Sequence, residues 1–135
     1  FLNSNNEEVT ATRNLIAANF TNCIIEGNNN IEFILDKNNG SDFNYNIENS
    51  MIRFNDFNDS FTGNTELNFN NATHYQNIIL NGEPNFKNTS LNNFMIGKNS
   101  DAINKAKASA ISEDILGINR TTNPDIGAYQ HITFN

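Results

Sequence analysis

The sequence predicts an all-β solenoid, a fold in which each repeat of the chain forms one coil. A strand-sized apolar segment at residues 20–27 returns in altered form at residues 47–54, and the same frame then reaches residues 76–82. Recurrence of one apolar segment at a fixed period is the signature of stacked repeats. The 27-residue offset pairs Phe20 with Ile47, Asn22 with Asn49, Cys23 with Ser50 and Ile25 with Ile52.

The composition favours a β fold with many turns. Hydrophobic residues make up 37% of the chain, below the roughly 45–50% of a typical domain, and asparagine accounts for more than a fifth. Asparagine-rich tracts can be disordered and prone to aggregate. Asparagine also tolerates left-handed backbone angles and stabilises turns. Because it alternates here with Phe and Ile, we favour the second interpretation.

Charge and apolar content exclude several kinds of partner. The net charge is −7 and the pI is about 4.6, so a nucleic-acid backbone would be repelled. The acidic balance suits solubility outside the cell. No apolar run approaches the roughly 20 residues of a membrane-spanning helix. The single cysteine, Cys23, lies in an apolar run, and we expect it to be a small buried hydrophobe.

The first coil begins after a polar segment, residues 1–13, that we interpret as a frayed end or a strand of an earlier coil. Since the sequence starts without an initiator Met, we expect it to be the tail of a longer protein or a trimmed one. Residues 14–19 predict a strand that leads to a corner at Asn22. After a turn at residues 28–30, residues 31–36 predict a second strand of the same coil.

The later elements follow the same logic. Residues 43–54 predict the second coil, 55–73 an insertion with a strand-like alternation at 67–69, and 76–82 the third coil. A bend anchored by Phe86 precedes a last strand at residues 91–96. Small apolar residues then recur at helical spacing behind Ser100, a good N-cap, so we expect a short helix within residues 100–112. The positions that set this spacing are Ala102, Ile103, Ala106, Ala110 and Ile111.

Three short segments near the C-terminus occur in a characteristic order. They are Ser100-Asp101-Ala102-Ile103-Asn104, Asp114-Ile115-Leu116-Gly117 and Pro124-Asp125-Ile126-Gly127-Ala128-Tyr129. In this order they resemble the C-terminal signature of bacterial pectate-lyase-like surface proteins, which are right-handed parallel β-helices with a choice-of-anchor type of ending. Residues 79–86 and 93–96 resemble the stretch that precedes this signature. Departures from the pattern include Asp101 for Pro, Asn104 for Asp and Gln130 for Glu.

The resemblance implies a right-handed parallel β-helix in which each 27-residue repeat is approximately one coil. It divides the chain into coils at residues 1–99, the closing end of a longer solenoid, and a C-terminal cap at residues 100–135 that contains the short helix. It also implies a location outside the cell or on the bacterial outer-membrane surface, with a partner in an outer-membrane assembly as one option. Such a cap would cover the open edge of the last coil.

Residues 56–62 contain the best candidate for a metal site. Asp56, Asn58 and Asp59 offer oxygen ligands on a loop, but Phe61 and Leu67 stand where an EF-hand needs Gly and Glu. A looser calcium site, which the resemblance to calcium-using lyases also suggests, competes with a solvated loop. His74 and His131 are far apart and have no partner at zinc-ligand spacing.

No set of residues forms a recognisable catalytic motif. A β-elimination lyase would need a base such as Lys or Arg, with carboxylates or calcium to neutralise a uronate, and Arg53, Lys37 and Lys87 are isolated candidates. Arg53 is also a candidate ligand-binding residue, and aromatic side chains exposed on a face of the fold could stack on sugars. The aromatic candidates are Tyr45, Phe57, Phe61 and Tyr75. Several Asn-x-Ser/Thr triplets also occur, as the abundance of asparagine makes inevitable.

Three functions remain open at this point. The first is a non-catalytic surface β-helix module that binds glycans or other surface proteins. The second is the C-terminal part of a polysaccharide lyase or hydrolase whose active site lies upstream. The third is a structural stalk or adhesin segment. Fold analogy does not separate them.

Overall fold

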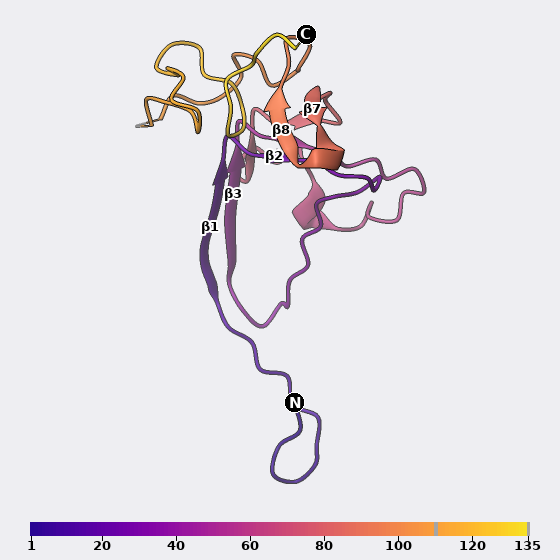
Figure 1. The fold of residues 1–135 in the computed structure, drawn as a ribbon. Coiled ribbons are helices and arrows are strands. Elements are labelled where there is room, and N and C mark those ends of the chain that lie inside the picture. The colour runs from indigo at the N-terminus through magenta and orange to yellow at the C-terminus, as the bar shows by residue number, and fades with distance from the viewer. Residues whose placement is uncertain (110, 135) are drawn as a thin grey trace.

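The computed structural model describes residues 1–109 and 111–134 and shows an all-β protein. Three successive passes of the chain lie side by side and form two parallel sheets (Figure 1). Each pass contributes a strand to both sheets, with a corner between them. The first pass holds β1 (Leu15–Thr21) and β2 (Ile24–Ile25), the second β3 (Phe43–Glu48) and β4 (Met51–Ile52), and the third β5 (Tyr75–Gln76) and β6 (Ile79–Leu80).

The register confirms the predicted 27-residue step between the first two passes and corrects the next one. Phe20 pairs with Ile47 at an offset of 27 residues, whereas Ile47 pairs with Tyr75 at an offset of 28 residues. A constant 27-residue frame would have paired Ile47 with His74. The extra residue is accommodated in the long loop between β4 and β5, where added length costs little.

Asparagine at each corner turns the chain from one sheet into the other. Asn22, Asn49 and Asn77 have φ values of 58°, 45° and 54°, a left-handed conformation that asparagine tolerates better than other residues with a Cβ. Within the described residues, nine of the ten non-glycine positions with positive φ are asparagines. The predicted corner at Asn22 is therefore confirmed, and the asparagine content serves the turns.

The interior between the sheets is an apolar and aromatic core. Ile47 and Ile52 of the second pass are fully buried, and a loop after β4 closes the open side with aromatic rings. Phe69 packs on Phe54 and Tyr75 with ring centroids 5.0 and 4.8 Å apart. A short 3₁₀ turn, η1 (Thr65–Leu67), brings Leu67 into the same core.

A second apolar cluster covers the outer side of the sheet formed by β2, β4 and β6. Met51 is fully buried there against Ile96, Ala102 and Ile126. An antiparallel pair, β7 and β8, and the chain that follows provide this cover. Their bounds are β7 (Phe86–Asn88), η2 (Thr89–Leu91) and β8 (Asn93–Ile96).

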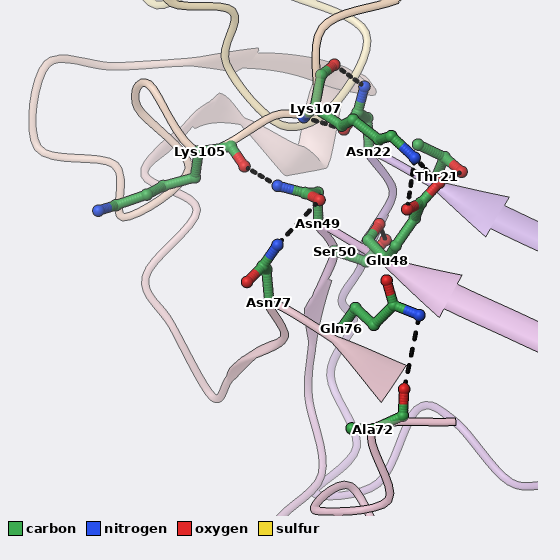
Figure 2. A network of polar contacts seen from close by, with 10 residues as sticks. All are labelled: Thr21, Asn22, Glu48, Asn49, Ser50, Ala72, Gln76, Asn77, Lys105 and Lys107. Atoms are coloured by element: carbon green, nitrogen blue, oxygen red, sulfur yellow. Dashed lines mark hydrogen bonds and ion pairs between the residues drawn. The ribbon is translucent and has the colours of Figure 1, made fainter. Parts of the chain in front are cut away.

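The C-terminal segment lies along the corners of the passes (Figure 1). Asn49 Nδ2 donates to the Lys105 carbonyl at 2.8 Å, and Asn22 Nδ2 donates to the Lys107 carbonyl at 2.9 Å. Figure 2 shows these contacts beside the ion pair of Lys107 with Glu48 (Nζ–Oε2, 2.8 Å). The described part of residues 100–135 thus follows the flank of the passes from the second to the first.

Three predicted elements are corrected by the structure. Residues 31–36 form no strand, although Phe33 enters the core and Ile31 makes an isolated antiparallel bridge with Phe54. Residues 67–69 form no strand either. Leu67 ends the 3₁₀ turn η1, and the backbone N–H of Asn68 donates to the Thr65 carbonyl and closes that turn. The described residues of 100–112 form turns and irregular chain rather than a helix, and Ala110 lies outside the described residues.

Turns replace the predicted helix because side-chain oxygens accept the backbone N–H groups that a helix would use. Ser100 Oγ accepts the Ala102 N–H at 3.2 Å, and Asp125 Oδ1 accepts the Asn104 N–H at 2.8 Å. Asn104 has a φ of 58°, which ends any helical run. Local side-chain acceptors of this kind favour turns over helices.

Candidate functional site

A groove on the side of the molecule separates the second sheet from the β7–β8 pair. It consists of two hollows of about 430 and 470 Å³ that share Glu26, Phe86 and Phe94, so they adjoin. Hollows of this size are typical of sites for small ligands. We call this feature the side groove. Its other polar and aromatic lining includes Cys23, Asn28, Arg53, Glu83, Thr89 and Tyr129.

A partly buried ion pair lies in the side groove. Glu26 and Arg53 follow β2 and β4 directly, at equivalent positions of adjacent passes. Arg53 Nε donates to Glu26 Oε1, and the side chains are 31% and 7% exposed. The second carboxylate oxygen, Glu26 Oε2, is buried and has no hydrogen-bond partner within the described residues. Leaving a buried acceptor unpaired costs free energy. A hydrogen-bond donor that reached this oxygen from the groove would remove that cost.

An aromatic pair forms the opposite wall. The rings of Phe86 on β7 and Phe94 on β8 lie 5.4 Å apart at 81°, an edge-to-face contact that fixes both. Phe94 is 45% exposed. The groove therefore combines an apolar ring surface with a guanidinium and a carboxylate in one lining.

The side groove presents polar side chains, one thiol and an exposed aromatic ring. Cys23 is the sole thiol in its lining, and burial raises the pKa of this thiol, which keeps it protonated at neutral pH. The groove presents hydrogen-bond donors from Arg53, acceptors from Glu26 and Glu83, and the ring of Phe94.

The structure separates the predicted ligand-binding residues. Arg53 lines the side groove, whereas Phe57 is 76% exposed on the loop after β4. Phe61 is half-buried against Phe54, with ring centroids 6.0 Å apart. Tyr45 and Tyr75 are the remaining two, and both belong to the core.

Burial removes Tyr45 and Tyr75 from any surface site. They are 6% and 4% exposed, and both hydroxyls donate to the Glu66 carbonyl. Burial raises the pKa of Tyr45, and the neighbouring Tyr75 raises it further. Their phenol groups therefore hold η1 against the core and offer no ring face to a ligand.

The predicted calcium loop is closed by its own backbone. Asp56 Oδ1 accepts the Ser60 N–H at 2.9 Å, and Oδ2 accepts the Phe61 N–H at 2.8 Å. Asp59 adopts a left-handed φ of 54° at the turn. Across residues 1–109 and 111–134, no three His, Cys, Asp or Glu side chains gather as metal ligands. Calcium binding by Asp56, Asn58 and Asp59 stays a prediction.

Both histidines take part in local structure. His74 stacks on Tyr45 with ring centroids 4.2 Å apart, and its Nδ1 lies 2.9 Å from the Tyr45 carbonyl. His131 Nδ1 lies 2.7 Å from Asp125 Oδ2, and Asp125 is fully buried. The same carboxylate accepts the His131 N–H at 2.6 Å, so this pair fixes the chain end.

Sequence reasoning overlooked Glu26 and Phe94 as site residues. The repeat itself contained a signal for Glu26, because Glu26 and Arg53 are separated by 27 residues, the offset of the first two passes. Opposite charges at equivalent positions of adjacent parallel strands predict a cross-strand pair. Phe94 had no comparable signal, since its position depends on the fold of β7–β8 over the second sheet.

Comparisons with known proteins give this chain no relative. No family model matches it, and neither a curated protein nor a solved structure shows significant similarity. In the part of the chain that the structure describes, no helix is both long and apolar enough to cross a membrane.

Proposed function

We propose that this chain is a non-catalytic parallel β-helix module of a surface or secreted protein, and that it binds its partner in the side groove. One observation carries the binding role: an exposed aromatic ring, Phe94, lines the same hollow as the Arg53–Glu26 pair. Glycans and surface proteins are the two classes of partner that such a groove suits.

The registers support the β-helix part of this proposal. Three passes pair in parallel at offsets of 27 and 28 residues, with an asparagine at every corner. Burial also differs between paired residues of the first and second passes: Phe20 is 38% exposed, whereas its partner Ile47 is fully buried. The exposed Phe20 leaves apolar surface that a further coil on the β1 side would cover.

The pairing of two basic side chains supports a non-catalytic role for the described residues. Arg53 is paired with Glu26, and Lys37 is paired with Glu66 on another side of the molecule. A uronate lyase needs a basic group free to take a proton near a neutralised carboxylate. The alternative, in which catalytic coils precede this module in a polysaccharide lyase or hydrolase, keeps the same binding role for the groove.

The experiment is to incubate the chain with uronate polymers, with and without calcium, and to follow the ultraviolet absorbance of unsaturated products. We expect no product. Product formation would contradict the non-catalytic proposal, and its loss in Arg53→Lys would assign the activity to the side groove. The matched control is Lys87→Arg, a conservative change at an exposed cation on β7 outside the groove lining.

A further inference from the structure

We propose that the side groove binds a neutral oligosaccharide, with one sugar ring stacked on Phe94 and its hydroxyls held by Arg53, Glu26 and Glu83. This inference rests on the proposed binding function of the groove and names the class of its ligand. Three features of the groove support it: the aromatic wall, the unpaired acceptor and the charge of the lining.

The aromatic wall fits the apolar face of a pyranose ring. Phe94 lines both hollows and keeps 45% of its surface exposed, while the edge-to-face contact with Phe86 fixes its orientation. The face of an aromatic ring carries partial negative charge, and the C–H groups of a pyranose face carry partial positive charge. Stacking of a sugar therefore covers the exposed ring, and it costs Phe94 little side-chain entropy because Phe86 already fixes the ring.

The polar wall fits hydroxyl groups. Arg53 uses Nε for Glu26, and within the described residues its terminal nitrogens have no hydrogen-bond partner. Glu26 Oε2 lacks a donor there as well. A sugar hydroxyl both donates and accepts, so adjacent hydroxyls can accept from the guanidinium and donate to Glu26 after a small rotation of its carboxylate. The ligand would thus satisfy the acceptor that the groove leaves unpaired.

The charge of the lining selects a neutral sugar over an acidic one. Arg53 contributes one positive charge to the larger hollow, whereas Glu26 and Glu83 contribute two negative charges. The whole chain carries a net charge of −7. A uronate carboxylate entering the groove would meet net repulsion, because the one cation is already paired with Glu26.

The test is isothermal titration of the chain with linear neutral hexaoses of glucose, mannose and xylose, chosen after a glycan array, and with hexagalacturonate. We expect a neutral hexaose to bind and hexagalacturonate to bind more weakly. Phe94→Ala should weaken binding by about tenfold, as expected for loss of a central aromatic contact. Phe57→Ala is the matched control, because Phe57 is an exposed aromatic residue outside the groove lining, and its affinity should not change.

Two further variants keep the result interpretable. Phe94→Leu keeps an apolar side chain on β8 and should still lose stacking, so it replaces Phe94→Ala if that variant does not fold. Arg53→Lys keeps the charge opposite Glu26 but removes the guanidinium fork, and it should weaken binding several-fold. Thermal unfolding of each variant checks its fold.

Three results would overturn the inference. They are tighter binding of hexagalacturonate than of every neutral hexaose, a loss of affinity in Phe57→Ala equal to that in Phe94→Ala, and no neutral glycan bound on the array by the folded chain. The last result leaves the proposed binding function standing if a protein partner crosslinks to the groove. The proposed function itself fails if the chain cleaves a uronate polymer.

Discussion

Asn22 and Lys107 exchange two hydrogen bonds although they lie 85 residues apart in the sequence. Asn22 Nδ2 donates to the Lys107 carbonyl at 2.9 Å, and the Lys107 N–H donates to Asn22 Oδ1 at 2.7 Å. The amide side chain thereby mimics a strand neighbour and holds the C-terminal segment on the first corner (Figure 2). Because the same residue has a φ of 58°, one asparagine turns the chain and attaches its end.

Asn22→Ala should therefore destabilise the fold by about 2–4 kcal/mol, from the left-handed backbone and the two lost hydrogen bonds. Urea unfolding measures this change. Asn22→Gly separates the two causes, since glycine accepts the backbone angle but still loses the bonds, and it should cost about 1–2 kcal/mol. Equal stability of the glycine variant and the wild type would show that the bonds to Lys107 contribute nothing.

Gly127→Ala should also destabilise the fold. Gly127 has a φ of 102°, and a Cβ there would lie 2.9 Å from Ile24 Cδ1. Left-handed strain and the close contact together should cost about 2–4 kcal/mol, seen as a lower midpoint of thermal unfolding. Gly63→Ala is the matched control, because a Cβ at Gly63 meets nothing within 4 Å. An unchanged midpoint for Gly127→Ala would contradict the described packing against β2.

The second pass should dominate the stability of the core. Ile52→Ala removes a fully buried side chain and should cost about 2–5 kcal/mol in urea unfolding. Leu80→Ala changes the equivalent residue of the third pass, which is 41% exposed, and should cost about 1 kcal/mol or less. Equal losses for the two variants would mean that the third pass is covered as fully as the second.

Asp114 should make stability depend on pH in the acidic range. Burial alone would raise the pKa of its carboxyl, but the backbone N–H groups of Gln130, Ile118 and Leu116 lower the pKa overall, with help from Arg120. A lowered folded-state pKa means that this stabilisation is complete above the ordinary value of about 4 and is lost as the pH falls through the folded-state pKa. Asp114→Asn should flatten that part of the curve of unfolding free energy against pH.

A matched variant shows whether the effect belongs to Asp114. Asp36 is an exposed carboxylate, and Asp36→Asn should leave the curve unchanged. If Asp114→Asn and the wild type lose stability in parallel as the pH falls below the ordinary carboxyl value of about 4, the described bonds to Asp114 do not stabilise its charged form.

The sequence predicts the strands and corners of the three passes better than the loops and the C-terminal segment that surround them. Residues 20–27 and 47–54 repeat with their apolar spacing intact, so the pairing of Phe20 with Ile47 follows from the sequence. The later 28-residue step does not, because its extra residue lies in a loop whose length is only weakly constrained. The asparagine corners follow from the backbone preference of that residue.

The site was less predictable for a physical reason. Tyr45 and Tyr75 have the composition of ligand-stacking residues, but alternation along β3 and β5 points them into the core. Arg53 lines the groove because it directly follows β4, a strand whose position the repeat predicts. Phe94 lines the same hollow as Arg53 only because β7 and β8 fold back over the second sheet, a long-range arrangement that no local pattern encodes.

Mapping the bound ligand on the protein tests whether the side groove is the binding site. Backbone and aromatic NMR shifts are followed while a neutral hexaose that binds is titrated to saturation. We expect the largest shifts at Glu26, Arg53, Phe86 and Phe94, which line the side groove. Largest shifts at the loop that carries Phe57 and Phe61, with none at Arg53 or Phe94, would contradict this expectation.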